Sequence, residues 1–265
     1  MAFFGAELRR ARLSAGLSQE QLGRVLSYSG DLIGKVEIGE RAPTPEFAGR
    51  CDEAFSHLDG LFGRLLGLAR RWDGPYPQWF RDWVQAEKEA TSLRSWEPML
   101  VPGLLQTADY ARALFQAWQS SASDELEELV NARIARQSIL DRPRPPELWV
   151  VVDEAVLHRC IGSRKTMYDQ LLHLADCSCR PSITVQVVPA DVSTHAGLLG
   201  GFIVASFGEG APSIVYVETA VEGQTIEKSS LVNKAASVFD RLRSEALPRK
   251  SSRDLIGRVA EERWT

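Results

Sequence analysis

Apolar residues recur at helical spacing near the start of the chain and predict a small all-α unit. The first helix is marked by positions on one face, Leu8, Ala11, Arg12 and Ala15. Gly16 ends it, because glycine readily adopts the left-handed conformation of a helix C-terminus. A second helix follows, with Ser18 as N-cap and Gln21 completing a capping box. Leu17 is expected to pack against an apolar run in that helix, Leu22, Val25 and Leu26.

The same pattern predicts three more helices in this unit. Ser27 and Tyr28 form a turn, and Ser29 is the N-cap of a third helix. The apolar stripe of the third helix is Leu32, Ile33 and Val36. A fourth helix begins at Thr44-Pro45-Glu46, with proline at the first helical position, and residues 59–71 continue as a fifth.

A change of pattern follows residues 72–80, WDGPYPQWF, where proline, glycine and aromatic residues concentrate. We place a domain boundary there, between residues 1–73 and residues 74–265. Beyond it, the expected strands are 148–153, 183–189, 201–207 and 213–219, and the expected helices are near 77–91, 107–118, 124–140, 164–176, 228–246 and 251–263. The sequence therefore predicts an N-terminal all-α domain of about five helices and a larger mixed α+β domain.

Composition narrows the class of protein. Of 265 residues, 44% are hydrophobic and 25% are charged, an ordinary globular balance. No segment approaches the eighteen or so consecutive apolar residues of a membrane span, and the N-terminus lacks the apolar core of a signal peptide. These features predict a cytoplasmic protein that does not enter the membrane. Four unevenly spaced cysteines are then expected to be reduced thiols.

The charge pattern bears on nucleic-acid binding. The formal net charge of -4 argues against a chain that coats nucleic acid along its length, and residues 1–51 carry only one more base than acids. Two short capped helices joined by a three-residue turn can nevertheless hold the second helix across a major groove. The same pattern fits a small helical bundle that binds no DNA, so the pattern alone leaves both interpretations open.

The segments GLSQEQLGRVL and YSGDLIGKVEIGERAP favour the first interpretation. They resemble the Xre-type, lambda-repressor-like helix-turn-helix family over residues 5–60. The residues that align with the family's sequence pattern are Gln19, Leu22, Ile33, Val36, Glu37, Gly39, Arg41 and Pro43. The resemblance implies four base-facing positions, Gly30, Asp31, Gly34 and Lys35. It implies three positions near DNA phosphates, Gln19, Ser29 and Arg41.

The chemistry of these positions supports few direct contacts. Asp31 can accept a hydrogen bond from a cytosine amino group and Lys35 can donate to guanine. For Asp31 we favour a local role at the dipole of its own helix, where it can also cap backbone amides, over contact with a base. Glu37 is expected to hold the fold through an arginine. Much of the binding is expected to come from phosphate contacts by Arg9, Arg10, Arg12 and Arg41. These arginines equally suit a solvated helix face, and among them only Arg41 belongs to the motif. We therefore expect two copies, a homodimer, to bind DNA about a two-fold axis.

Three segments of the larger domain carry a second resemblance, SWEPMLVPGLLQTADYARALF, VQVVPADVSTHAGLLGGFIVASF and FDRLRSEALPRKSSRDLI. They are similar to the C-terminal domain of a large family of actinobacterial Xre-type regulators, over residues 75–260. That domain has no agreed biochemical function. Such regulators are often encoded beside a very small protein and are likened to antitoxins. The resemblance thus implies a DNA-binding protein controlled by a small protein partner, and it does not imply an enzyme.

Two segments of the larger domain have a structural and a functional interpretation. Pro98, Pro102 and Gly103 predict an irregular turn that buries Trp96, Leu100 and Leu104, and aromatic residues at such spacing favour a structural role over a ligand cradle. The stretch VSTHAGLLGGF, which is rich in small residues, either clamps a ligand or peptide or forms a long hairpin connection between two strands.

Metal and catalytic sites are not expected. Soft ligands are offered by His158, Cys160, His173, Cys177 and Cys179, but the C-S-C spacing is not that of a zinc knuckle. Ser193, Thr194 and His195 lack a nucleophile-elbow sequence, although a triad can be built from distant residues. The sequence GLLGG lacks the lysine and hydroxyl residue of a phosphate-binding loop. We therefore predict no cofactor, no metal and no enzymatic activity.

These observations favour a transcriptional regulator that binds a specific double-stranded operator as a dimer. Its larger domain would dimerise and receive a signal, for which a small protein partner is the preferred source. A rival interpretation is an antitoxin-like protein-interaction adaptor that binds DNA weakly, in keeping with the nearly neutral N-terminal domain. A third is a small-molecule sensor or degenerate enzyme in the larger domain.

Overall fold

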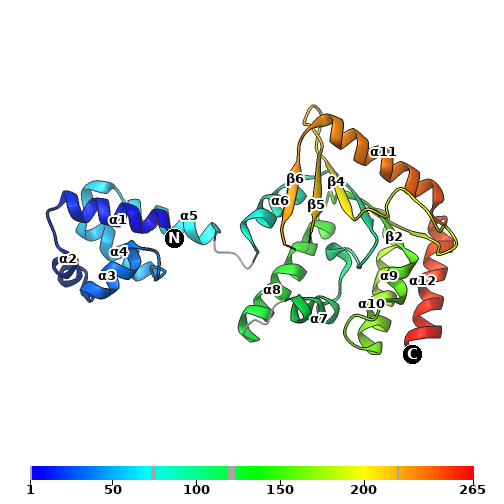
Figure 1. Cartoon of the computed structure of the whole chain (residues 1–265), viewed down its shortest axis with the longest axis horizontal. Helices are drawn as coiled ribbons and strands as arrows, with labels where there is room; N and C mark the ends of the chain where they lie inside the picture. The colour runs from blue at the N-terminus through cyan, green and yellow to red at the C-terminus, as the bar shows by residue number, and fades with distance from the viewer. Residues whose placement is uncertain (1, 73–75, 119–122, 220) are drawn as a thin grey trace. The chain divides into compact units, whose positions relative to one another are not determined.

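A computed structural model describes residues 2–72, 76–118, 123–219 and 221–265. The chain forms two compact units, residues 1–74 and residues 75–265, each with its own hydrophobic core (Figure 1). The first unit is helical, and the second combines a six-stranded sheet with helices. The predicted fold class, an all-α helix-turn-helix domain followed by an α+β domain, is confirmed.

The N-terminal unit is built from short helices around one apolar core. Its elements are α1 (Ala2–Ser14), α2 (Gln19–Leu26), α3 (Gly30–Glu37), α4 (Pro45–Ala54), the 3-10 turn η1 (Ser56–Leu58) and α5 (Leu61–Trp72). The buried core residues include Phe4, Leu8, Leu22, Leu26, Ile33, Val36, Phe47, Phe55 and Phe62. Every helix thus contributes an apolar face, as the helical spacing predicts.

Local signals set the helix ends. The Ser18 hydroxyl accepts a hydrogen bond from Gln21 N (3.1 Å), and Gln21 Oε1 accepts one from Ser18 N (2.7 Å), so the predicted capping box is confirmed. Ser29 caps α3 by accepting from Leu32 N. One expectation is wrong: Val25 does not join the apolar run, because it lies on the outer face of α2 and is 58% exposed.

The C-terminal unit contains a mixed sheet with the strand order β3-β2-β1-β4-β5-β6. Its strands are β1 (Ser92–Glu97), β2 (Glu147–Asp153), β3 (Ile183–Val188), β4 (Phe202–Ser206), β5 (Ile214–Glu218) and β6 (Gly223–Ile226). The first three are parallel, whereas β4, β5 and β6 continue the sheet as antiparallel neighbours. The carboxyl ends of three adjacent parallel strands therefore lie at one edge of the sheet.

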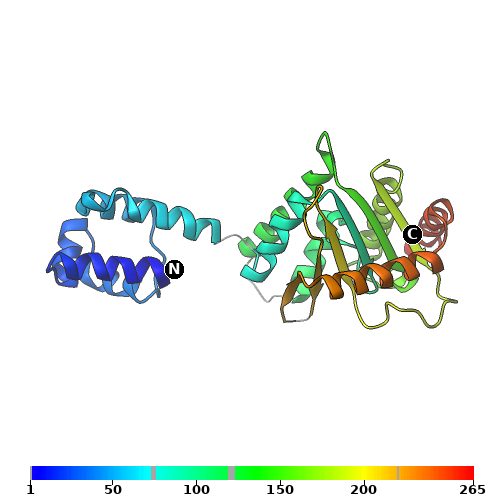
Figure 2. The same ribbon diagram turned by 90° about the horizontal axis from the view of Figure 1, so that it is seen from above.

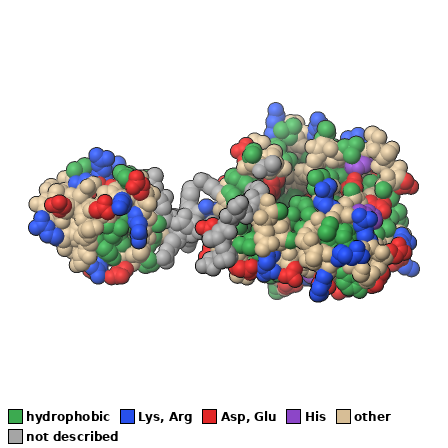
Figure 3. Space-filling model, turned by 60° about the horizontal axis from the view of Figure 1, so that its bottom comes forward, with side chains coloured by type: hydrophobic (Ala, Val, Ile, Leu, Met, Phe, Trp, Pro, Cys, Tyr) green, Lys and Arg blue, Asp and Glu red, His purple; other side chains and the backbone are tan. Residues whose placement is uncertain are grey.

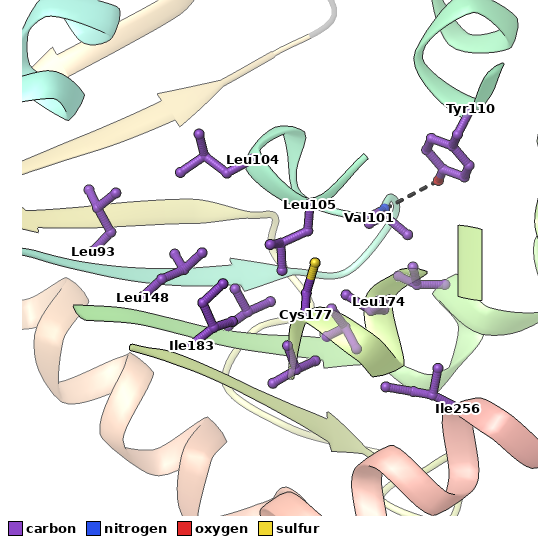
Figure 4. Close-up of a cluster of buried hydrophobic side chains, with 14 of the residues drawn as sticks. Leu93, Val101, Leu104, Leu105, Tyr110, Leu148, Leu174, Cys177, Ile183 and Ile256 are labelled. Atoms are coloured by element: carbon purple, nitrogen blue, oxygen red, sulfur yellow. Dashed lines mark hydrogen bonds between the residues drawn. The ribbon is translucent and has the colours of Figure 1, made fainter. Parts of the chain in front are cut away.

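Helices cover both faces of this sheet. The remaining elements are α6 (Gln78–Glu89), η2 (Gly103–Leu105), α7 (Ala108–Trp118), α8 (Ser123–Arg136), η3 (Gln137–Asp141), α9 (Glu154–His158), α10 (Arg164–Cys177), α11 (Ser229–Glu245) and α12 (Arg249–Trp264). Figure 2 shows α11 lying along one face, where Phe239 and Leu242 meet Trp96 and Val151. On the other face, Figure 4 shows Leu93, Leu148 and Ile183 of the strands close to Leu104 and Leu105 of η2.

Four features of this unit differ from the expectations. The expected strands include neither β1 nor β6, and the expected helices do not include the short helix α9. The four residues of β6, GQTI, lack the apolar alternation that identifies a strand in isolation. The segment 189–201 is not a hairpin connection, because β3 and β4 are not neighbours and the chain must cross from the edge strand to the far side of β1.

Candidate nucleic-acid interface

The helices α2 and α3 are held together through glycine. A Cβ atom at Gly23 would lie 2.7 Å from the Tyr28 carbonyl oxygen and 3.0 Å from Gly30 N, so only glycine permits this approach without a shift. The turn itself uses Ser27 in the left-handed conformation, with φ of 61°. The two capped helices and their short turn therefore form the geometry that presents α3 to a DNA groove.

The glycines of α3 face α2. A Cβ atom at Gly30 would lie 3.0 Å from Glu20 Cγ, and one at Gly34 would lie 3.3 Å from Gln19 Oε1. Both positions are partly buried. Their small size therefore serves the contact between the two helices. Any contact that Gly30 or Gly34 makes with DNA would come from the backbone, and their base-facing role stays a prediction.

The polar side chains that α3 presents to solvent are paired with each other. Lys35 Nζ lies 2.8 Å from Asp31 Oδ2, four residues earlier on the same helix. The side chains are 49% and 73% exposed, respectively. The hydrogen bond to Asp31 raises the pKa of Lys35. Lys35 is thus a charged donor at the surface, and Asp31 holds it in place and partly offsets its charge.

A buried network supports α3 from behind. The Arg12 guanidinium donates from Nε to Glu37 Oε1 (2.6 Å) and from Nη2 to Glu37 Oε2 (2.9 Å). Arg12 Nη1 also donates to the Leu17 carbonyl, and Gln19 Nε2 donates to Glu37 Oε2 (2.9 Å). Burial alone would raise the pKa of Glu37, but the hydrogen bonds from Arg12 and Gln19 lower it below its ordinary value. This network confirms that Glu37 holds the fold through an arginine.

The network bears on the phosphate contacts expected of Arg12 and Gln19. Arg12 was expected among the phosphate contacts, but it is 7% exposed and its guanidinium is occupied by Glu37, so that expectation is wrong. Gln19 is exposed as a residue, yet its amide nitrogen is already bound to Glu37. That nitrogen carries two hydrogens, so one N–H of the Gln19 side chain remains to donate to a phosphate. Ser29 and Arg41 are both exposed, Ser29 at the start of α3 and Arg41 beyond its end.

Few cations of this unit are free to meet phosphates. Among the side chains of residues 3–67, which the structure describes, the arginines outside any ion pair are Arg9, Arg24 and Arg41. Arg10 pairs with Glu7 at 3.3 Å. Figure 3 shows basic and acidic side chains intermixed on the visible face of the unit. The electrostatic attraction to DNA is therefore carried by a small number of side chains.

In the C-terminal unit, the segment 189–201 is fixed at its base. His195 Nε2 lies 3.3 Å from Asp153 Oδ2, and His195 Nδ1 accepts a hydrogen bond from Gly197 N (3.3 Å). Trp96 Nε1 donates to the Gly197 carbonyl oxygen (2.9 Å). Both ring nitrogens of His195 are thus engaged, so neither is free to activate Ser193 or Thr194 as a nucleophile. The geometry supports a structural role for this histidine.

The candidate metal ligands are spread apart. His173 Nε2 lies 3.4 Å from Cys177 Sγ on α10, whereas Cys179 Sγ accepts a hydrogen bond from Arg253 and Cys160 is exposed. Within the described residues, no three histidine, cysteine or carboxylate side chains gather closely enough to hold a metal ion. In the same part of the chain, no helix has the length and apolar character needed to cross a membrane.

The proline- and glycine-rich segment after β1 packs on the sheet. Tyr110 Oη accepts a hydrogen bond from Val101 N (3.2 Å), and Trp96 and Leu104 are buried as expected, while Leu100 is only partly buried. A cavity of about 20 Å³ lies beneath this segment, beside Glu87 and Arg136. That volume accommodates about one water molecule and is far smaller than a pocket for an organic ligand.

Comparison with models of protein families gives two matches. Residues 4–58 match a helix-turn-helix domain. Residues 80–258 match a domain of unknown function (DUF5753). No curated protein and no solved structure matches the chain. The first match spans α1 to α4 with the network described above, and it identifies the N-terminal unit as a DNA-binding domain of the type found in regulators.

Proposed function

Because the chain belongs to the family defined by the domain of unknown function (DUF5753) and also carries a helix-turn-helix domain, we propose that it is a sequence-specific transcriptional regulator of the Xre type. The observation that carries the proposal is the exposed pair of Asp31 and Lys35 on α3, a helix fixed by the Arg12–Glu37 network. Lys35 donates to guanine acceptors in the major groove, and Asp31 sets its position.

The scarcity of free cations supports a dimer. Among the side chains of residues 3–67, the arginines outside ion pairs are Arg9, Arg24 and Arg41, and three such cations release few counterions from DNA. Two units about a two-fold axis read two half-sites and combine their contacts. Arg41, together with Gln19 and Ser29 at the starts of α2 and α3, contacts phosphates in this proposal.

The C-terminal unit receives the signal in this proposal, and a small protein partner is its preferred source. It has no enzymatic role, which is consistent with His195 being held on both ring nitrogens. A small-molecule sensor is a further alternative, for which an open hollow of about 380 Å³ beside Asp141, Arg142 and Arg180 offers a place for a ligand. The adaptor remains the rival hypothesis, because a nearly neutral helical unit with paired charges also suits weak DNA binding.

The proposal is tested by the salt dependence of binding to a mixed-sequence duplex. We expect the affinity of the full chain to fall steeply as salt rises, because counterions are released from the phosphates. Arg41→Ala is expected to weaken binding on all sequences alike and to reduce the slope of log affinity against log salt by about 1.

Lys250→Ala is the matched control, because it removes one exposed positive charge from the other unit and makes the same change in net charge. It is expected to leave the slope unchanged. Equal slopes for wild type and Arg41→Ala would contradict the assignment of Arg41. Undetectable binding even at low salt would favour the adaptor.

A further inference from the structure

The two edges of the sheet in the C-terminal unit differ in how their backbone groups are satisfied. At the β3 edge, Val187 N donates to Ser252 Oγ (3.0 Å), and the Val187 carbonyl oxygen accepts a hydrogen bond from Leu247 N (2.8 Å). Residues at the start of α12 and just before it therefore cover this edge. The opposite edge strand is β6, whose neighbour in the sheet is β5.

The hydrogen bonds of the β5–β6 hairpin show which backbone groups of β6 point outward. Thr219 N donates to the Glu222 carbonyl oxygen (2.8 Å), so these two residues form a hydrogen-bonded pair. In an antiparallel ladder such pairs alternate with pairs that are not hydrogen-bonded. Gly223 and Thr225 belong to pairs of the second kind. Their N–H and C=O groups therefore point away from β5, toward the edge of the sheet.

The helices beside β6 leave these groups unpaired. One helix, α6, packs on one face of the strand, where a Cβ atom at Gly223 would lie 2.7 Å from the Trp79 ring. The other, α11, packs on the opposite face, where Ile226 joins the apolar cluster that contains Val232. Within the described residues, the backbone groups of Gly223 and Thr225 form no hydrogen bond beyond the sheet. The edge is thus able to pair with another strand.

The extended segment at this edge is centred on Thr225. It runs from Glu222, after the hairpin turn, to Lys228, the N-cap of α11. Two copies that pair antiparallel about a two-fold axis at Thr225 bring the whole segment opposite itself. Gly223 then faces Glu227 of the second copy, and the backbone groups of both point outward because the direction alternates along a strand. A regular antiparallel ladder results.

This register is also complementary in charge. Glu222 of each copy faces Lys228 of the other copy, and both residues are exposed in the single chain. Opposite charges at directly facing positions of an antiparallel pair are favourable, whereas like charges there are unfavourable. A shift by two residues in either direction removes both of these pairs. The charges therefore favour the same register that aligns the whole extended segment.

Exposed apolar side chains flank the edge. Val221, in the turn before β6, is 84% exposed, and Leu231, near the start of α11, is 45% exposed. In the same register Val221 faces Ser229 of the second copy, so it lies close to the start of that copy's α11. Burial of these side chains between the copies adds apolar area to the short strands.

We propose that β6 pairs with β6 of a second copy of this chain, so that the two sheets become one continuous sheet across a two-fold axis. This inference rests on the homodimer of the proposed function and assigns its interface in the C-terminal unit. Because the paired strands are short, we expect a dimer that dissociates on dilution.

The test is the molar mass of the full chain, measured by sedimentation equilibrium without DNA over a series of concentrations. Wild type is expected to pass from dimer to monomer on dilution. Glu222→Lys and Lys228→Glu each place like charges opposite each other twice, and each is expected to raise the dissociation constant of the dimer about tenfold. The double variant restores opposite charges and is expected to recover the wild-type dissociation constant.

Glu147→Lys is the matched control for Glu222→Lys. Glu147 is exposed at the start of β2, and three strands separate β2 from β6 in the sheet. The control makes the same change in charge and is expected to leave the dissociation constant unchanged.

Thr225→Pro tests the ladder itself. It removes an outward N–H group, at a position where an edge strand tolerates proline because that group does not pair with β5. The variant is expected to be folded and monomeric. A monomeric wild type at every concentration, or a dimer that none of these variants weakens, would overturn the proposal. The salt dependence measured with Arg41→Ala judges DNA binding separately, so failure of this interface is distinguishable from failure of the DNA-binding role.

Discussion

Among single residues, Arg12 and Glu37 have a clear energetic role, because their buried ion pair joins α1 to α3 through two hydrogen bonds. The side chains are 9% and 2% exposed. Losing one partner of such a pair leaves a buried charge without compensation and costs roughly 3–5 kcal/mol. The orientation of α3 therefore depends on residues that face away from the proposed DNA surface.

Glu37→Gln is expected to lower the free energy of unfolding of the N-terminal unit by about 3 kcal/mol at neutral pH. Hydrogen exchange of the amides in α1, α2 and α3 measures this loss. Because the pKa of Glu37 is lowered in the folded unit, its contribution is present above the ordinary value of 4.5 and is lost as the pH falls below it. The difference between variant and wild type should therefore shrink in acid.

Glu46→Gln is the control for this variant, since Glu46 forms an exposed pair with Arg50 at 2.8 Å on α4. Exposed pairs of this kind contribute less than about 1 kcal/mol. Equal losses of protection for Glu37→Gln and Glu46→Gln would contradict the structural role of the buried network.

Arg12 also shows what the sequence can reveal about a single position. It shares the inward face of the first helix with Leu8 and Ala11, and this spacing was the signal for its burial. By contrast, the positive charge of the arginine side chain, taken without its position on the helix, suggested a contact with a DNA phosphate. The pairing of Lys35 with Asp31 was likewise visible as a four-residue spacing on one helix. The sequence alone could not reveal that Gly30 and Gly34 face α2, because that depends on how the helices pack.

At the scale of elements, the segment 189–201 depends on a close contact with the sheet. Trp96 Nε1 donates to the Gly197 carbonyl oxygen, and a Cβ atom at Gly197 would overlap the indole of Trp96. Gly197→Ala is expected to destabilise the C-terminal unit by about 1–3 kcal/mol, because the segment or the indole must shift. Chemical unfolding followed by tryptophan fluorescence measures the effect.

Gly208→Ala is the control for the contact at Gly197. A Cβ atom at Gly208 would meet no atom within 4 Å, so little change is expected. If Gly208→Ala and Gly197→Ala had the same stability, the segment would not be held as described.

The sequence predicted those helices whose ends are fixed by residues close together in the chain. The caps of α2 and α3 involve residues three positions apart, and each can be identified from a short stretch. By contrast, the bond from Trp96 to Gly197 joins residues 101 positions apart. The strand β6 and the crossing from β3 to β4 depend on the order of strands in the sheet, which no local pattern contains.

At the scale of the whole molecule, the two units have separate cores and separate expected roles. In the proposed function, the helix-turn-helix domain binds DNA, and we assign reception of the signal to the other unit. The central claim is that α3 reads sequence through Lys35.

That claim is tested most directly by selecting bound sequences from random duplex DNA with wild type and with Lys35→Ala. The account predicts a two-fold-symmetric motif for wild type, with guanine preferred at one position of each half-site. It predicts that Lys35→Ala relaxes the preference at that position and keeps the rest of the motif. An identical motif from both proteins, or no enriched motif from wild type, would contradict it.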